Sequence, residues 1–87
     1  MNLTLIVNPS ASAYTPKRRQ LVEEALRDGH QLTVIETTHR NHATELARQA
    51  AADGAEAVVV MGGDGTLNVA ANGVAGTNTA LAPLPGG

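Results

Sequence analysis

The most diagnostic part of the chain is Val58-Val59-Val60-Met61-Gly62-Gly63-Asp64-Gly65-Thr66. An apolar run typical of a buried strand leads directly into three glycines around one aspartate, and we expect a helix to begin at Thr66. Glycines at such a turn let the backbone approach a ligand closely and adopt positive φ angles. The N–H groups that open the following helix would form a seat for phosphate. The segment therefore predicts a phosphate-binding strand–loop–helix unit.

Asp64 is the unexpected residue of this loop, because a carboxylate repels phosphate. The combination makes chemical sense when a cation lies between the two groups, since Mg²⁺ is usually held by one or two carboxylates together with substrate phosphates. The loop is neither a Walker A loop nor a Gly-x-Gly-x-x-Gly fingerprint. The alternative is a plain strand-to-helix turn, in which Asp and Gly are ordinary residues. Three glycines within four residues exceed what a turn requires, so we favour a metal–nucleotide site.

Strand and helix patterns alternate along the rest of the chain. The predicted strands cover residues 3–7, 31–36, 57–61 and 79–84. The predicted helices run from Thr15-Pro16 to a stop at Gly29, from an Asn41 cap to Gly54, and from Thr66 to about Asn72, closed by Asn72-Gly73. This alternation predicts an α/β fold, a three-layer sandwich in which a mostly parallel sheet of about four strands has helices on both faces.

Ligands of such folds bind at the carboxyl ends of the strands. Three loop signals fall on that edge: Asn8-Pro9-Ser10, the Gly62–Thr66 loop and Pro85-Gly86-Gly87. The Asn8 amide and the Ser10 hydroxyl could bond ribose or phosphate oxygens, and the alternative is an Asn-Pro turn without a ligand. Asn68, on the third predicted helix, could line the site or cap the helix locally.

Composition excludes several function classes. The chain has 87 residues, enough for one small domain, and a net charge of −2, which gives no basic field for nucleic acid. Tyr14 is its sole Phe, Trp or Tyr, so a nucleic-acid stacking platform is not expected. The absence of cysteine excludes disulfides and thiolate metal sites. No apolar run approaches the ~20 residues of a membrane span, and we expect a cytoplasmic domain.

Histidines and clustered cations are assigned no chemistry. His30, His39 and His42 have no convincing metal partners, and we expect His39 and His42 to flank a helix start in solvent. Lys17-Arg18-Arg19 opens the first predicted helix, where positive charge opposes the helix dipole. Such a cluster could contact phosphate, but we favour a solvated helix face.

The chain resembles the catalytic domain of diacylglycerol kinases, a family that includes bacterial lipid kinases and the sphingosine and ceramide kinases. The residues that carry the resemblance are Asn8-Pro9, Gly62-Gly63-Asp64-Gly65-Thr66-Leu67-Asn68 with Asn72-Gly73, and Leu81-Ala82-Pro83-Leu84-Pro85-Gly86-Gly87. They correspond to the amino-terminal, nucleotide-binding lobe, and we expect residues 1–87 to be a fragment of a longer two-domain kinase that is inactive alone. The Gly-Gly-Asp-Gly-Thr element is shared with NAD kinases and, as a variant, with phosphofructokinases.

The resemblance implies transfer of the γ-phosphoryl group of ATP to a lipid hydroxyl such as that of diacylglycerol. It implies that Asp64 acts through Mg²⁺ or as a base, and that ATP is held by Asn8, Pro9, Ser10, Gly62, Gly63, Gly65, Thr66 and Asn68. The lipid would be met at the inner membrane surface through a second lobe. Two departures are Ala11-Ser12, where the family commonly has Ser-Gly, and Val69, where it commonly has Glu.

Three further possibilities stay open at the level of sequence. One is NAD kinase, or another kinase of a soluble substrate that shares the loop. Another is a nucleotide-binding module without catalysis. The short sheet would also have exposed edges, which leaves homo-oligomerisation open.

Overall fold

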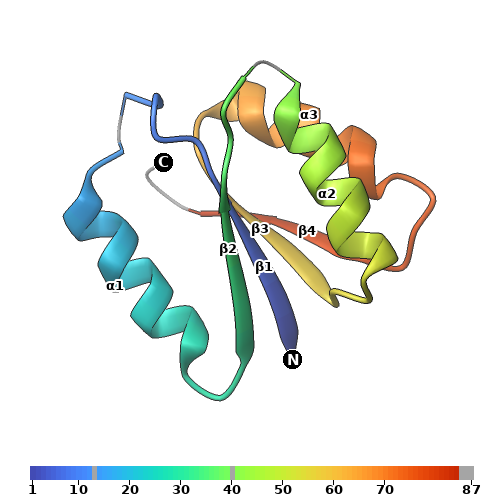
Figure 1. The fold of residues 1–87 in the computed structure, drawn as a ribbon, viewed down its shortest axis with the longest axis horizontal. Coiled ribbons are helices and arrows are strands. Elements are labelled where there is room, and N and C mark those ends of the chain that lie inside the picture. The colour runs from blue at the N-terminus through green and yellow to red at the C-terminus, as the bar shows by residue number, and fades with distance from the viewer. Residues whose placement is uncertain (13, 40, 85–87) are drawn as a thin grey trace.

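A computed structural model describes residues 1–12, 14–39 and 41–84, which form alternating strands and helices (Figure 1). The strands are β1 (Asn2–Val7), β2 (Gln31–Glu36), β3 (Ala57–Met61) and β4 (Ala80–Pro83). The helices are α1 (Pro16–Arg27), α2 (His42–Ala52) and α3 (Asp64–Val74). All strand pairs are parallel, in the order β2-β1-β3-β4. The predicted α/β fold with about four parallel strands is confirmed.

Helices cover both faces of the sheet, α1 on one and α2 with α3 on the other (Figure 1). The α1 face holds a cluster of alternate strand residues: Leu5, Val7, Val59 and Met61. Under α2 and α3, strand residues meet small helical ones: Ile6, Val58, Val60, Ala43, Ala47, Ala50 and Ala70. The two central strands are therefore buried on both sides, which explains why their sequences are continuously apolar rather than alternating.

The order of the strands creates a switch point beside β1. The chain runs from β1 through α1 to β2 on one side, and then returns through α2 to β3 on the other side of β1. The loops that follow β1 and β3 therefore diverge towards opposite faces of the sheet. Folds of this kind leave a crevice at the carboxyl ends of these two strands.

The ends of α1 and the stop of α2 follow the local signals in the sequence. Thr15 occupies the N-cap of α1, where its Oγ1 accepts a hydrogen bond from the backbone N of Arg18 at 3.1 Å, and Pro16 is the first helical residue. Gly29 and Gly54 follow α1 and α2 with φ angles of 78° and 88°. Glycine adopts this left-handed conformation without steric cost, so these predicted stops are confirmed.

Asn41 occupies the N-cap position of α2, but its side chain does not form the usual capping hydrogen bond. It directly precedes the helix, yet its φ of 65° is left-handed and its side chain makes no capping hydrogen bond. The backbone N of Thr44 instead donates to the Asn41 carbonyl at 3.2 Å. The predicted N-cap position is therefore confirmed, but the Asn41 side chain contributes no hydrogen bond to the cap. Asparagine tolerates the left-handed region better than most residues, which accounts for its presence there.

Both predicted ends of the third helix are also wrong. The helix α3 begins at Asp64, two residues before Thr66, and continues through Asn72-Gly73 to Val74. Gly73 does not stop the helix because it is a packing position. A Cβ atom at Gly73 would collide with the backbone oxygen of Thr44 and lie 2.8 Å from the Cβ of Ala47. The Thr44 hydroxyl also donates to the Val69 carbonyl at 2.6 Å, so α2 and α3 are in close contact.

We predict that Gly73→Ala destabilises the chain by about 1–3 kcal/mol, because the added methyl group must push α2 away from α3. This loss opposes the gain of ~1 kcal/mol that alanine normally brings to a helix interior. Urea unfolding followed by circular dichroism measures the difference. Asn72→Ala, at the neighbouring exposed position, is the matched control and should be neutral or stabilising. A Gly73→Ala variant as stable as the wild type would contradict close helix packing at this point.

Candidate functional site

A cleft of about 730 Å³ opens at the carboxyl ends of β1, β2 and β3. Its size lies within the range typical of small-molecule sites, ~300–1,000 Å³. The lining residues come from the loops after β1 and β2 and from the first two turns of α2 and α3: Asn8, Ser10, Thr37, Thr38, His39, Asn41, Ala43, Gly65, Thr66 and Val69. The cleft therefore lies beside the switch point of the sheet.

Asn8 connects the loop after β1 to α3. Its side-chain Nδ2 donates to the Thr66 hydroxyl oxygen at 3.1 Å, and its Oδ1 accepts from the backbone N of Ser10 at 3.0 Å. Its own backbone N donates to the Met61 carbonyl at 2.9 Å. Both ends of the Asn8 amide thus have partners within the protein. The side chain fixes the position of Thr66 relative to the loop that carries Ser10.

The three glycines of the loop have different roles. A Cβ atom on Gly62 would lie 2.9 Å from the Thr66 Oγ1 and 3.2 Å from the Asn8 Cβ, so glycine is needed there for the Asn8–Thr66 contact. A Cβ atom on Gly63 or Gly65 would meet nothing within 4 Å. The expected positive φ angles are absent from this loop, since the described glycines with positive φ are Gly29, Gly54 and Gly76. Bare backbone, rather than unusual dihedrals, is what these glycines supply.

The first turn of α3 presents uncapped N–H groups. Gly63, which has no side chain, occupies the N-cap position, and none of the described side chains makes a capping hydrogen bond to this turn. Such a turn carries the partial positive charge of the helix dipole and favours an anion. The Thr66 hydroxyl oxygen already accepts a hydrogen bond from Asn8, so its own hydrogen is left to donate. The geometry of this end of the cleft suits an oxyanion such as phosphate.

The residues that the sequence pointed to are partly assembled. Asn8, Ser10, Gly65 and Thr66 line the cleft. Gly62 lies close to the side chains of Thr66 and Asn8, and Pro9 is half-buried beside Asn8. Gly63 and Asn68 are exposed and do not line it. On α3, the next residue after Asn68, Val69, lines the cleft instead. Asp64 opens α3, but its side chain lies outside the described part of the structure, as do residues 85–87. The binding roles of all these residues stay predictions.

Sequence reasoning missed the wall of the cleft that follows β2. Thr37, Thr38, His39 and Asn41 line this wall, and the backbone N of Thr37 donates to the Val7 carbonyl at 2.8 Å. The signal was present in the sequence, because two threonines directly follow the second predicted strand at the same carboxyl edge. The glycine loop dominates the sequence pattern, whereas His39 is expected from the sequence only to flank a helix start in solvent.

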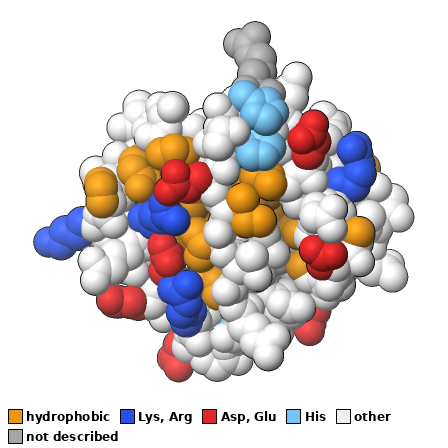
Figure 2. Space-filling view, in the orientation of Figure 1, with side chains coloured by type: hydrophobic (Ala, Val, Ile, Leu, Met, Phe, Trp, Pro, Cys, Tyr) orange, Lys and Arg blue, Asp and Glu red, His pale blue; other side chains and the backbone are white. Residues whose placement is uncertain are grey.

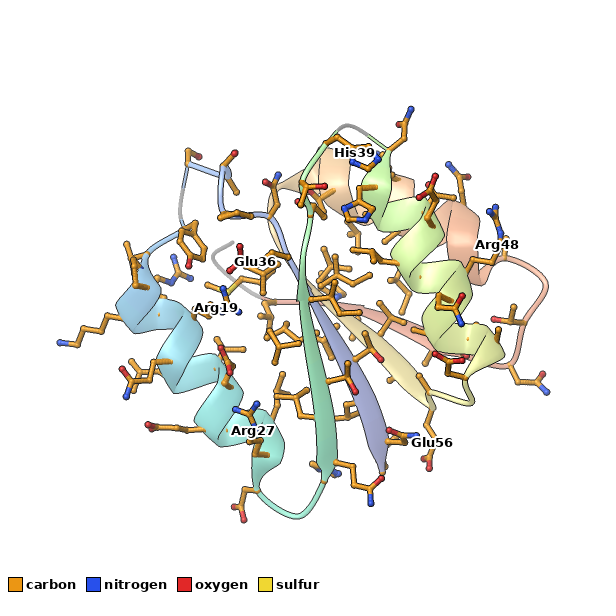
Figure 3. All side chains as sticks on the ribbon, in the orientation of Figure 1. Arg19, Arg27, Glu36, His39, Arg48 and Glu56 are labelled. Atoms are coloured by element: carbon orange, nitrogen blue, oxygen red, sulfur yellow. The ribbon has the colours of Figure 1, made fainter. Side chains whose placement is uncertain are left out.

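The described ion pairs lie within α1 and between α1 and β2. On α1, Glu23 pairs with Arg19 and with Arg27 at 2.9 Å each, and Arg19 also pairs with Glu36 of β2 (Figure 3). Hydrogen bonds from Arg27 and Arg19 lower the pKa of the Glu23 carboxyl. Arg19 thus belongs to a surface ion-pair network, in line with the predicted helix-surface role. None of the described residues that line the cleft is Asp, Glu, Lys or Arg.

The described parts of residues 1–12, 14–39 and 41–84 contain neither a metal-binding cluster of side chains nor a membrane-spanning helix. Among the described side chains, which do not include that of Asp64, no group of three or more His, Cys, Asp or Glu residues could hold a metal ion. None of the helices in these ranges has the length and apolar character needed to cross a membrane.

A family model and solved structures both relate the chain to diacylglycerol kinases. A family model for the diacylglycerol kinase catalytic domain matches residues 2–87. A crystal structure of a diacylglycerol kinase from Bacillus anthracis strain Sterne matches at a TM-score of 0.78 and 27% identity, over 99% of this chain and 33% of that chain. Another, of a protein assigned as a diacylglycerol kinase in the same strain, matches at 0.80 and 28%, over 99% and 31%. The chain therefore spans about a third of the length of these structures.

The fold also occurs in a more distant structure. The solution structure of a phosphate-loop protein matches at a TM-score of 0.59 and 19% identity, over 93% of this chain and 76% of that chain. At this identity the likeness concerns the fold alone. A comparison with curated proteins finds no match.

We predict that Asn8 and Thr66 are energetically coupled. Asn8→Ala, Thr66→Val and the double variant form a cycle whose coupling energy should be about 0.5–1.5 kcal/mol, because the two residues share one half-buried hydrogen bond. Urea unfolding of the four proteins measures it. Asn8→Ala combined with Asn68→Ala, on the exposed face of α3, is the control pair and should be additive. Additive effects for Asn8 and Thr66 would mean that the bond contributes nothing.

Proposed function

This chain belongs to the diacylglycerol kinase catalytic domain family, and we propose that it forms the ATP-binding lobe of a lipid kinase. The parent reaction is transfer of the γ-phosphoryl group of ATP to a lipid hydroxyl, such as that of diacylglycerol. The single observation that carries the nucleotide site is the uncapped first turn of α3, which opens into a cleft at the switch point. The lipid would be bound by a second lobe, since the chain spans about a third of its structural relatives.

In this proposal the phosphates lie against bare backbone at the start of α3. Gly63 and Gly65 have open space where a side chain would be, and the Thr66 hydroxyl can donate a hydrogen bond. No described lysine or arginine lines the cleft, so none of the described side chains offsets the phosphate charge. The helix dipole supplies part of the compensation, and the remainder calls for a bound cation.

Asp64 is our candidate to hold that cation, Mg²⁺. It is the first residue of α3, next to Gly65 of the cleft. A single carboxylate fits Mg²⁺, which commonly takes one or two carboxylates and completes its shell with phosphate oxygens and water. The lack of a cluster of three ligands among the described side chains fits an ion that binds together with the nucleotide. Bound there, the ion would neutralise charge on the phosphates.

Catalysis in this proposal comes from positioning. Asn8 holds Thr66, and Thr66 with the α3 amides orients the phosphate chain so that the γ-phosphoryl group faces the acceptor. A preorganised set of donors costs no reorganisation during transfer. The acceptor hydroxyl attacks the γ-phosphorus in line, its proton leaves to a base, and ADP departs with the electron pair of the broken bond. Asp64 is the candidate for that base as well.

We predict that Mg²⁺ and ATP bind together and that Asp64 links them. Amide shifts in NMR titrations should centre on residues 8–10 and 62–66 for Mg²⁺–ATP, with no saturable shifts for Mg²⁺ alone. Asp64→Asn should weaken Mg²⁺–ATP binding at least ~10-fold, but leave Mg²⁺-free ATP binding unchanged or tighter because repulsion is removed. Asp53→Asn, at the end of α2, is the matched control. Equal Mg²⁺ dependence in wild type and Asp64→Asn would overturn this role.

The reaction itself requires the two-lobed protein. With labelled ATP and diacylglycerol in detergent micelles, the protein should form phosphatidate, and Asp64→Asn should reduce the rate by at least ~10³-fold while the fold is retained. NAD offered in place of the lipid is the control acceptor and should yield no NADP. Formation of NADP without phosphatidate would instead assign the site to a kinase of a soluble substrate.

A further inference from the structure

Two stacked imidazoles stand at the rim of the cleft, and the proposed phosphate chemistry does not use them. The ring centroids of His39 and His42 lie 4.4 Å apart with an interplanar angle of 19°. Figure 3 places His39 at the end of α2 where the helix begins, and Figure 2 shows histidine side chains at the surface over that end of the molecule. A stack of this kind is a flat surface rather than a metal site, because its rings lie face to face.

The stack is held in place by Thr38. The Thr38 backbone N donates to the His42 Nδ1 at 3.0 Å, and the Thr38 hydroxyl lies 3.0 Å from the His39 Nδ1. The backbone N of His42 donates to the His39 carbonyl at 3.2 Å, and His42 is the first residue of α2. The His39 ring is therefore fixed by contact on one face and by a hydrogen bond at its edge. A preorganised ring loses little conformational freedom when a ligand packs on it.

The His39 ring has one face covered by His42, and His39 is the member of the pair that reaches the cleft. His39 lines the cleft and is exposed, whereas His42, which covers its other face, does not line it. His42 thus backs His39 as seen from the cleft. This arrangement leaves one flat imidazole face for a planar group bound in the same cleft as the start of α3.

Other rings of the chain lie elsewhere. Tyr14 packs against the cluster on the α1 face of the sheet. His30 precedes β2, at the opposite end of that strand from the cleft. Among the described residues that line the cleft, His39 is the one with a ring. A ligand with a planar end and an anionic end would therefore meet a ring at one wall and an uncapped helix start at the other.

We propose that His39 is the stacking platform for the base of the nucleotide, and that the backed imidazole favours a purine over a pyrimidine. This inference rests on the proposed function, because it assumes that the phosphates lie at the start of α3. A purine covers more of the ring than a pyrimidine does, so stacking discriminates by area rather than by hydrogen bonding. Stacking of a base on an aromatic side chain is typically worth a factor of about 5–150 in affinity.

The test compares ATP, CTP and inorganic triphosphate, each with Mg²⁺, in calorimetric titrations of the chain. Triphosphate is the probe that keeps the anionic end and lacks the base. His39→Ala should weaken ATP binding about 10-fold, weaken CTP binding less, and leave triphosphate binding unchanged. His39→Phe keeps a flat ring and should retain ATP affinity within about 3-fold. His30→Ala, at the other end of β2, is the matched control and should change none of the three.

The outcomes separate the two proposals. Tight triphosphate binding, with ATP bound no more tightly, would overturn the platform while leaving the phosphate site in place. An equal loss of ATP and triphosphate affinity in His39→Ala would assign His39 to the phosphates or to folding, and would also overturn it. Loss of ATP affinity in His39→Phe as large as in His39→Ala would show that stacking is not the interaction. Binding of none of the three probes by the wild type would overturn the proposed function and the platform together.

Discussion

The pairing of β1 with β3 is the constraint on which the site depends. The register aligns Val7 with Met61, and the backbone N of Asn8 continues the ladder to the Met61 carbonyl. Asn8 and Gly62 therefore leave the sheet side by side. Both strands are buried on both faces, so a slip of one residue would turn core side chains the wrong way at two interfaces. Core packing thus fixes the register of the two strands, and with it the relative position of the loops that follow them.

Two glycines serve close packing in this architecture, in contrast to Gly29 and Gly54, which supply left-handed backbone after helices. Gly62 makes room for the Asn8–Thr66 contact, and Gly73 makes room for the approach of α2 to α3. The first sets the geometry of the loop and the second sets the position of the helix that follows it. Each glycine raises the entropy cost of ordering the backbone, and in each case a tertiary contact offsets that cost. A short chain with few large side chains can build close packing in this way.

Much of the fold could be predicted from local patterns, because strand bounds such as 31–36 and 57–61 depend on apolar runs between turn residues. The exceptions depend on contacts between distant residues. Gly73 looks like a helix stop until Thr44 is known to face it, and the left-handed backbone of the N-cap residue Asn41 has no signal in the local sequence. For the site, motif reasoning found Asn8, Ser10, Gly65 and Thr66 but not His39. Stacking of two histidines three residues apart has no composition signature, whereas a glycine loop does.

The two walls of the cleft differ in how freely evolution can change them. The wall at the start of α3 consists of amide groups and small residues, and backbone N–H groups are present whatever the side chains are. The wall after β2 consists of side chains on an exposed loop, which can be replaced without disturbing the core. Binding of the phosphates, which all nucleoside triphosphates share, would depend on the wall at the start of α3. Discrimination between bases would depend on the wall after β2, where the His39–His42 stack lies.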